Sequence, residues 1–238
     1  MSSDINIYAF QSDSISKSHS LESIKSGFVE KAKWYKVFLK EFLPLDKSIK
    51  IIDLPCGHGN LLYFLKSEGY TNFLGYDIDP GRIKIATSLE LNCELAEGLA
   101  AIKSEKEIDI VFSLDFLEHL SKEDAFEYMT DCYKSLKVGG KLIARMPITD
   151  NIMGTYDLYN DLTHKWSANS NCIVTLFELA GYSKVVVKDE RPVLYKPLNY
   201  LRLLIFKFLS NIHNAYLKLL GFSGYKLWSK SAYFIAYK

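Results

Sequence analysis

The spacing of apolar and polar positions changes along the chain. From Leu21 to Leu43 the apolar residues recur at helical spacing and Pro44 closes the stretch, which predicts a lead-in helix. Beyond it, short apolar runs typical of strands alternate with stretches of helical period. We expect strands at 49–54, 72–77, 94–96, 108–114 and 141–146, and helices at 60–68, 80–90 and 121–136, the last with Ser121 as N-cap and Gly139–Gly140 as its stop.

The regular alternation of predicted strands and helices ends after Pro147. Residues 151–165 are polar and aromatic and are expected to form a loop, whereas 167–180 predict a helix, and 184–188 and 232–237 predict two more strands. Between these two strands, residues 197–222 predict a very apolar helix. Its broad apolar face would contain Leu201, Leu204, Ile205, Phe208, Leu209, Ile212, Tyr216 and Leu219, with Lys207, Asn211, Asn214 and Lys218 on the opposite stripe.

This order of elements predicts the fold class. Alternating strands and helices form an α/β fold, in which a mostly parallel sheet is covered by helices on both faces. The seven expected strands make a doubly wound, seven-stranded sheet with a helical insertion, about 190–230, before the last strand. A chain of 238 residues holds one such domain and is too short for two. We expect an N-terminal arm and lead-in helix over 1–45 and the domain over 46–238.

Composition narrows the classes of partner and compartment. Lys and Arg total 29 against 28 for Asp and Glu, so no overall positive field favours nucleic acid as a partner. The four cysteines are far apart and form no CxxC pair, which indicates reduced thiols. The first twenty residues are polar and Ser-rich, without the apolar core of a signal peptide, and no run of about 18 apolar residues occurs. A cytoplasmic protein is expected.

Two glycines and an aspartate predict a nucleoside site. Gly57 and Gly59 lie where a strand passes into a helix, so the backbone can turn tightly and approach a ligand. Asp77 ends the following strand, where a carboxylate accepts hydrogen bonds from ribose hydroxyls in doubly wound folds. A dinucleotide dehydrogenase would normally need a third glycine, and Leu62 occupies that place.

The stretches IIDLPCGHGNLLYFL, FLGYDIDPGRIKIA, EIDIVFSLDFLEHL and YKSLKVGGKLIARMPI resemble the class I S-adenosylmethionine-dependent methyltransferases, over residues 49–188. The resemblance implies a Rossmann-like fold and S-adenosylmethionine as cofactor, with the glycine loop around its methionine part, Asp77 at the ribose and Glu97 near the adenine amino group. Pro55 stands where glycine is frequent, and Glu97 where aspartate is frequent. The cofactor-binding residues implied are Asp53, Pro55, Cys56, Gly57, Gly59, Asp77, Ile78, Glu97, Gly98 and Asp115.

A second motif carries the candidate chemistry. Asp115, Glu118 and His119 follow the fourth strand as DxxEH, and His164 follows the fifth in DLTHKW, so all four side chains are expected at the same mouth. Such a set suits a divalent metal without deciding between Mg, Mn, Fe and Zn. It resembles the acidic-xx-Glu-His motif of metal-dependent RNA-terminal 2′-O-methyltransferases and ubiquinone-pathway O-methyltransferases. Alternatively, His119 or His164 acts as general base.

Only a resemblance to known methyltransferases indicates which molecule accepts the methyl group. DLTHKW, AGYSKVVVKDERPV and the aromatic helical insertion resemble methyltransferases of bacterial surface-polysaccharide pathways, which implies a sugar or sugar-phosphate hydroxyl of a glycan precursor. An RNA-terminal 2′-O-methyltransferase, a quinone-type O-methyltransferase and a non-catalytic cofactor-binding subunit are the alternatives. The helix at 197–222 is expected to be a lid, a homodimer surface or a peripheral membrane contact, and monomer and homodimer both stay open.

Overall fold

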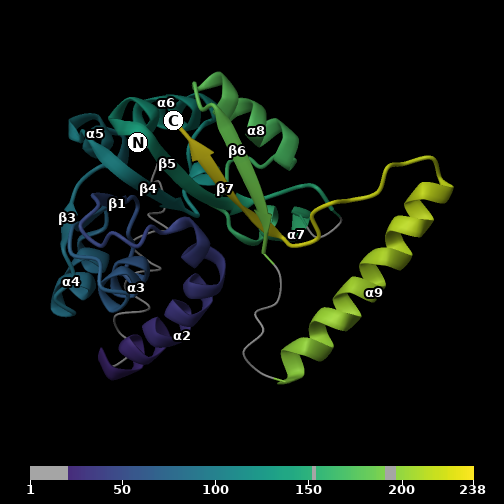
Figure 1. Ribbon diagram of the computed structural model, residues 1–238, viewed down its shortest axis with the longest axis horizontal. Coiled ribbons are helices and arrows are strands. Elements are labelled where there is room, and N and C mark those ends of the chain that lie inside the picture. Colours follow the sequence, from purple (N-terminus) through teal and green to yellow (C-terminus); the bar gives the residue numbers. More distant parts are fainter. Residues whose placement is uncertain (1–20, 152–153, 191–196) are drawn as a thin grey trace, which may run out of the picture.

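The computed structural model describes residues 21–151, 154–190 and 197–238, so residues 1–20 of the expected N-terminal arm lie outside the described residues. Its centre is a seven-stranded sheet in the order β3-β2-β1-β4-β5-β7-β6 (Figure 1). The strands are β1 (Ile51–Asp53), β2 (Phe73–Asp77), β3 (Cys93–Leu95), β4 (Ile108–Leu114), β5 (Leu136–Pro147), β6 (Lys184–Asp189) and β7 (Ser231–Tyr237). All neighbours pair in parallel except β7, which runs antiparallel to β5 and β6. The predicted doubly wound, mostly parallel sheet is confirmed.

Helices cover both faces of the sheet. The α-helices are α2 (Leu21–Leu39), α3 (Asn60–Ser67), α4 (Pro80–Ser88), α5 (Gly98–Ser104), α6 (Lys122–Ser135), α7 (Gly154–Asn160), α8 (Ser170–Leu179) and α9 (Pro197–Leu219), and the short 3-10 helices are η1 (Lys40–Phe42) and η2 (Leu117–His119). Alternate residues of one strand enter different cores: Ile51 packs with α2 and α3, and Ile52 with α5 and α6. This is the period-2 pattern of a strand buried on both faces.

Three local expectations were wrong. Gly139–Gly140 does not stop a helix, because α6 already ends at Ser135 and both glycines lie inside β5, near a register shift between Ile108 and Ile110 of β4. Helix α5 was not expected. It has only seven residues, and its N-cap is Glu97, whose side chain accepts from the N–H groups of Leu99 and Ala100. Helix α7 lies in the expected loop at 151–165, and its sequence GTYDLYN contains several weak helix formers.

The sheet topology determines where a ligand can bind. The chain builds β1 to β3 outward in one direction and then returns to place β4 on the other side of β1. In open α/β sheets, ligands bind outside the carboxyl ends of the strands at such a switch point. Helix α9, the expected insertion between β6 and β7, projects away from this domain (Figure 1). Within the described ranges, the length and apolarity needed to cross a membrane are not combined in any helix.

Candidate functional site

A cavity of about 410 Å³ opens at this switch point, where β1, β2 and β4 end. It lies within the range of about 300–1,000 Å³ typical of small-molecule sites. Six of the predicted cofactor residues line it: Pro55, Asp77, Ile78, Glu97, Gly98 and Asp115. The other four are not part of its lining: Asp53 ends β1, and Cys56, Gly57 and Gly59 belong to the turn that leads into α3. Six of the ten residues expected around the cofactor thus line one cavity.

The glycine loop and Asp77 form one hydrogen-bonded unit. Gly57 and Gly59 have φ values of 54° and 90°, which L side chains rarely adopt. A Cβ on Gly59 would lie 2.5 Å from Cδ1 of Leu91, so the Leu91 side chain would have to move to admit it. Gly57 N–H donates to Oδ2 of Asp77 at 2.8 Å, and Asp79 N–H donates to Oδ1 at 2.9 Å. These bonds orient the nearly buried Asp77 carboxylate in the cavity wall.

Asp53 lies behind this unit, at the end of β1. Its side chain is 2% exposed. Burial raises the pKa of its carboxyl well above the ordinary value, and the nearby Asp77 carboxylate raises it further. The protonated form of Asp53 is therefore more favoured in the folded protein than in water.

Asp115 does not join the imidazoles as expected. It adopts a left-handed backbone conformation, with φ 55°, and its carboxylate forms an ion pair with the Arg145 guanidinium. Arg145 also binds Glu190, through Nη2 at 2.7 Å and Nε at 3.1 Å. Asp115 thus lines the cavity while its charge is paired with an arginine on β5.

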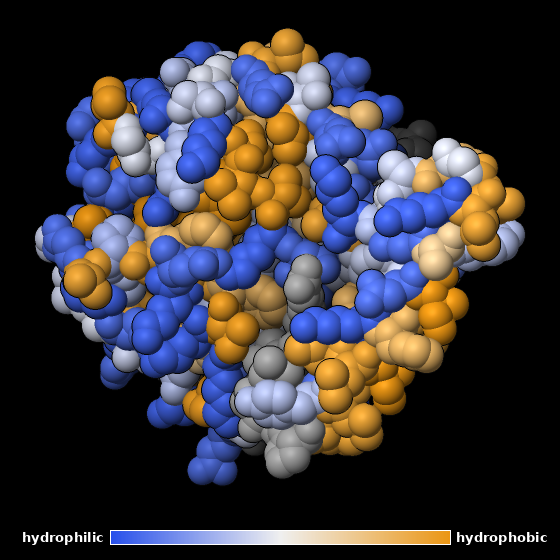
Figure 2. All heavy atoms as spheres, turned by 45° about the vertical axis from the view of Figure 1, so that its right-hand side comes forward, coloured by the Kyte–Doolittle hydropathy of each residue, from blue (hydrophilic) through white to orange (hydrophobic). Residues whose placement is uncertain are grey.

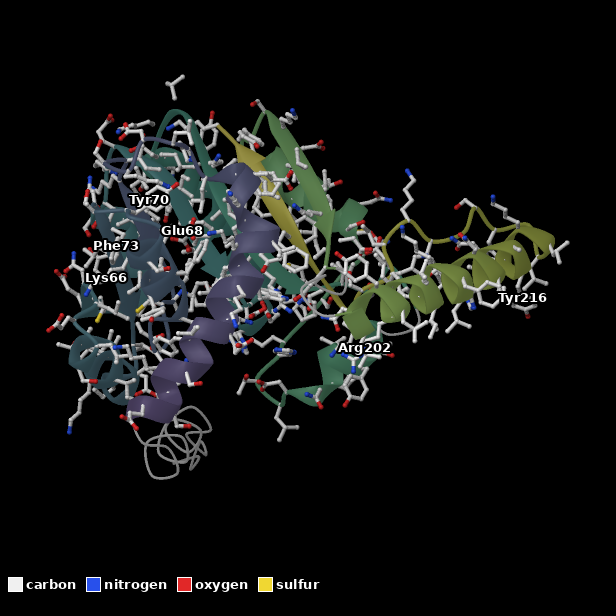
Figure 3. All side chains as sticks on the ribbon, turned by 60° about the horizontal axis from the view of Figure 1, so that its bottom comes forward. Lys66, Glu68, Tyr70, Phe73, Arg202 and Tyr216 are labelled. Carbon is white, nitrogen blue, oxygen red and sulfur yellow. The ribbon has the colours of Figure 1, made fainter. Side chains whose placement is uncertain are left out.

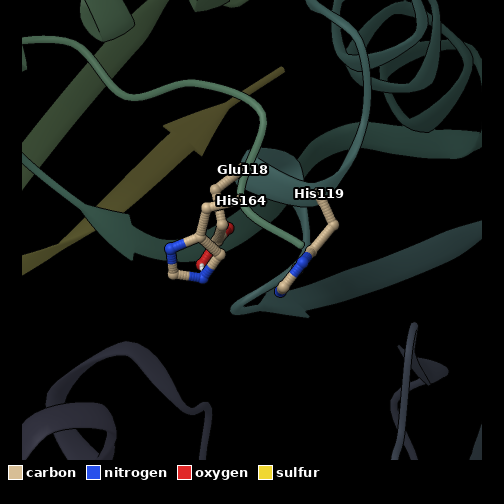
Figure 4. A group of neighbouring side chains, drawn as sticks. All are labelled: Glu118, His119 and His164. Carbon is tan, nitrogen blue, oxygen red and sulfur yellow. Dashed lines mark ion pairs between the residues drawn. The ribbon is translucent and has the colours of Figure 1, made fainter. Parts of the chain in front are cut away.

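Glu118, His119 and His164 do converge (Figure 4). One ligand atom from each lies within 4.8 Å of the others. The two imidazole rings meet edge to face at 4.8 Å between centroids, and Nε2 of His164 lies 4.0 Å from Oε1 of Glu118. Glu118 is 1% exposed, and its Oε2 has no hydrogen-bond partner among the described residues. Burial raises the pKa of Glu118 well above its usual value, with a further contribution from Asp115.

A hydrogen-bond chain fixes the protonated nitrogen of His119. Oγ1 of Thr163 lies 2.6 Å from Oδ1 of Asp161 and 2.8 Å from Nδ1 of His119. Burial alone would raise the pKa of Asp161, but the hydrogen bonds from Thr163 outweigh it and lower this pKa. An ionised carboxylate only accepts, so the single hydroxyl proton of Thr163 is donated to Asp161. The hydroxyl oxygen then accepts from Nδ1–H of His119, and the lone pair of the neutral ring is on Nε2.

His119 is also the member of the cluster that reaches the cavity, since it lines the wall together with Asp77 and Asp115. Burial lowers the pKa of its imidazole, and the neighbouring His164 lowers it further, so the neutral form is favoured. A neutral imidazole with a fixed tautomer beside a small-molecule cavity can remove a proton from a bound group.

Sequence reasoning missed several residues of this site. Asp161 lines the cavity and Thr163 connects it to His119, although both belong to the same DLTHKW stretch as His164. The signal available was Asp161-x-Thr163, an aspartate that accepts the backbone N–H two residues later, here at 2.8 Å. Arg82 also lines the cavity, with Nη1 3.9 Å from Oδ2 of Asp77, and no motif identified it.

Comparisons with known proteins show similarity in sequence and in fold. Residues 51–140 match the family described as methyltransferase domain, and this segment contains the glycine loop, Asp77 and the Asp115–His119 motif. No curated protein has significant sequence similarity to the chain.

Solved structures share the fold. A SAM-dependent methyltransferase from Archaeoglobus fulgidus superposes with a TM-score of 0.64 at 22% identity, covering 87% of this chain and 94% of that one. A putative O-methyltransferase from Nostoc punctiforme gives 0.60 at 14%, covering 92% and 58%. Phosphoethanolamine N-methyltransferase 2 of Haemonchus contortus, in complex with S-adenosyl-L-methionine, gives 0.58 at 17%, covering 85% and 51%, so this chain spans about half its length. Residues 51–140 are therefore similar to methyltransferase domains, and the chain shares the fold of S-adenosylmethionine-dependent methyltransferases.

Proposed function

We propose that this protein transfers the methyl group of S-adenosylmethionine to a hydroxyl group of a small acceptor, with His119 as general base. The observation that carries the proposal is the position of His119. Its ring lines the same cavity as Asp77, and its Nδ1 lies 2.8 Å from Oγ1 of Thr163, which we take to accept from Nδ1–H. The nucleoside-binding residues and a proton acceptor are thus on one wall.

The residues around the cavity suit the adenosyl group. Each carboxylate oxygen of Asp77 accepts one backbone N–H and keeps a lone pair that can accept from a ribose hydroxyl. The exposed Ile78 side chain offers an apolar surface next to it. Glu97 caps α5 with its carboxylate and also lines the cavity, where we assign it to the adenine.

The reaction requires a proton acceptor for the hydroxyl. Bound S-adenosylmethionine supplies an electrophilic methyl group on a sulfonium. As the acceptor oxygen bonds to the methyl carbon, the carbon–sulfur bond breaks and its electron pair stays on sulfur, while Nε2 of His119 takes the hydroxyl proton. The imidazolium formed keeps donating through Nδ1 to Thr163, and Asp161 supplies the compensating charge at the end of the chain.

Metal assistance is the second arrangement that the cluster supports. Glu118, His119 and His164 offer one carboxylate and two imidazoles, and the unpartnered Oε2 of buried Glu118 would gain a partner from a cation. Oxygen and nitrogen ligands of this kind suit Mg, Mn, Fe or Zn, and a cation there would lower the pKa of an acceptor hydroxyl. Asp115, the fourth predicted ligand, is instead engaged with Arg145.

The acceptor class stays a prediction. A sugar or sugar-phosphate hydroxyl of a cell-surface glycan precursor is favoured by the resemblance of DLTHKW and the residues after it to polysaccharide-pathway methyltransferases. RNA ends, quinone-type phenols and phosphoethanolamine are the alternatives. A non-catalytic role is disfavoured because such a role gives no reason for an oriented imidazole in the cavity.

Calorimetry and a product assay test the proposal. S-adenosylmethionine and S-adenosylhomocysteine should both bind, and S-adenosylhomocysteine should be released with one class in a panel of sugar nucleotides, glycan phosphates, short RNAs, quinols and phosphoethanolamine. The variants His119→Ala and His164→Ala should lose turnover while keeping cofactor affinity, whereas His213→Ala, a histidine on α9, should keep both.

Three results decide between the versions. No affinity for either cofactor form removes the whole function. Wild-type turnover in both site variants removes the imidazoles from the mechanism. Turnover that persists in the presence of a strong chelator eliminates the metal.

A further inference from the structure

Residues 197–230, which we call the arm, project from the domain (Figure 3). Arg202 lies near the start of α9 and Tyr216 towards its far end. One face of α9 packs against the segment that returns to β7: the Asn214 side chain accepts from Tyr225 N–H at 2.8 Å and donates to Tyr225 C=O at 3.0 Å. The His213 ring stacks on Tyr225 and contacts Trp228 edge to face. This face of the helix is therefore occupied.

The opposite face of α9 is apolar and exposed. At 100° per residue its side chains fall on one stripe that runs the whole helix, about 34 Å at 1.5 Å per residue. Each is at least half exposed, for example Leu204 and Phe208, both 64%. The stripe consists of Leu198, Leu201, Leu204, Ile205, Phe208, Leu209, Ile212, Tyr216 and Leu219. Figure 2 shows apolar atoms gathered along the arm, next to hydrophilic side chains. Such a large exposed apolar patch indicates an interaction surface.

Cations border this stripe on both sides. On the helical wheel Arg202 follows one edge, and Lys207 and Lys218 lie beyond the other. The sequence reinforces the pattern, because all 28 acidic residues precede residue 191, while eight of the 29 basic residues lie from residue 191 onward. The chain up to residue 190 is therefore acidic on balance, and the part containing the arm has no aspartate or glutamate.

We propose that the arm binds to the surface of an anionic lipid bilayer, with α9 lying in the plane of the interface. The apolar stripe would enter the boundary between headgroups and acyl chains, and Arg202, Lys207 and Lys218 would contact lipid phosphates. An apolar face flanked by basic residues is the pattern of helices that lie on membranes. Helix α9 is not apolar enough to cross a bilayer, which agrees with a surface position.

Charge also favours lipid over a second copy of the chain. Two copies that cover each other's stripe about a twofold axis would bring their border cations together. The arm has no aspartate or glutamate to pair with them. A surface of phosphates supplies the missing anions, whereas a self-contact does not.

Co-sedimentation with vesicles tests this inference independently of methyl transfer. The full chain should pellet with phosphatidylcholine vesicles containing about one-third phosphatidylglycerol and bind vesicles of phosphatidylcholine alone much more weakly. The variant Leu204→Ser/Phe208→Ser should lose at least about tenfold in partitioning, because two apolar side chains no longer enter the bilayer. Lys207→Gln/Lys218→Gln should lose roughly fivefold per lysine on anionic vesicles only.

The control is Leu45→Ser/Val138→Ser, which changes two apolar residues that are 95% exposed outside the arm and should leave partitioning unchanged. Circular dichroism should show the same fold and melting temperature for all variants. The inference is overturned if the wild-type protein stays in the supernatant with both vesicle types, or if Leu204→Ser/Phe208→Ser sediments like wild type. A stable dimer that this variant abolishes, without vesicle binding, would assign the stripe to a second copy.

Discussion

Replacing Thr163 by valine tests the proposed role of His119 most directly. Valine has the shape of threonine without the hydroxyl, so it removes the acceptor of Nδ1–H of His119 and the donor to Asp161. The backbone N–H of residue 163 still donates to Oδ1 of Asp161, so the local turn is retained. The change therefore isolates one hydroxyl group.

The size of the effect follows from the hydrogen bond lost. A donor left without its acceptor in a largely desolvated position costs about 1–3 kcal/mol. If the whole cost falls on the catalytically competent tautomer, kcat decreases about 5- to 150-fold, since about 1.36 kcal/mol corresponds to a factor of ten. The KM for S-adenosylmethionine should change little, because Thr163 is not among the residues that line the cavity.

Initial rates of S-adenosylhomocysteine release should be measured at saturating cofactor and acceptor. Thr163→Ser keeps the hydroxyl and should restore most of the rate, and Thr175→Val removes a hydroxyl that bonds only within α8 and should have no effect. The ¹⁵N shifts of the His119 ring should show the proton on Nδ1 in wild type and in Thr163→Ser, and a mixture in Thr163→Val. The reasoning is refuted if Thr163→Val has wild-type kcat, or if wild-type His119 already has its proton on Nε2.

Further predictions concern the glycine loop, the ribose carboxylate and the buried aspartate. Gly59→Ala should destabilise the protein by more than about 1–2 kcal/mol in denaturant unfolding, because φ is 90° and a Cβ would meet Leu91. Gly27→Ala is the matched control, because a Cβ there meets nothing within 4 Å. Equal stability of the two variants would contradict the packing argument. Asp77→Ala should weaken S-adenosylmethionine binding by at least about tenfold in calorimetry, because bonds to a charged acceptor are lost, and unchanged affinity would show that this carboxylate does not hold the ribose. The raised pKa of Asp53 means that the folded state keeps the carboxyl proton at pH values where the unfolded state has lost it. Wild-type stability should therefore decrease as pH rises from the unfolded pKa to the folded pKa, by at most about 1.4 kcal/mol per pH unit. Asp53→Asn should remove this decrease in melting curves taken from pH 4 to 8. Parallel pH profiles for wild type and Asp53→Asn would refute that role of Asp53.

The amino-acid sequence by itself determined the order and type of most elements. The seven strands are where short apolar runs predicted them, and Ser121 begins α6 by accepting the N–H of Asp124. These features depend on a local period or on a few neighbouring residues, so a single sequence contains enough information to find them. The glycine loop and Asp77 belong to the same class, since a strand, a tight turn and a following strand end place them at one edge of the sheet.

Only the tertiary structure decided how the candidate catalytic groups are paired. Thr163 contacts His119, which is 44 positions away in the sequence, and Arg145 pairs with Asp115, which is 30 positions away. Both pairs form because the ends of β4 and β5 and the loop after β5 lie at the same edge of the sheet. The sequence does not indicate which side chains at this edge point toward one another. The same applies to Gly139–Gly140, whose inclusion in β5 depends on pairing with β4 rather than on local preference. Local patterns therefore determined the framework, whereas the partners of each charge and each proton follow from contacts between distant segments.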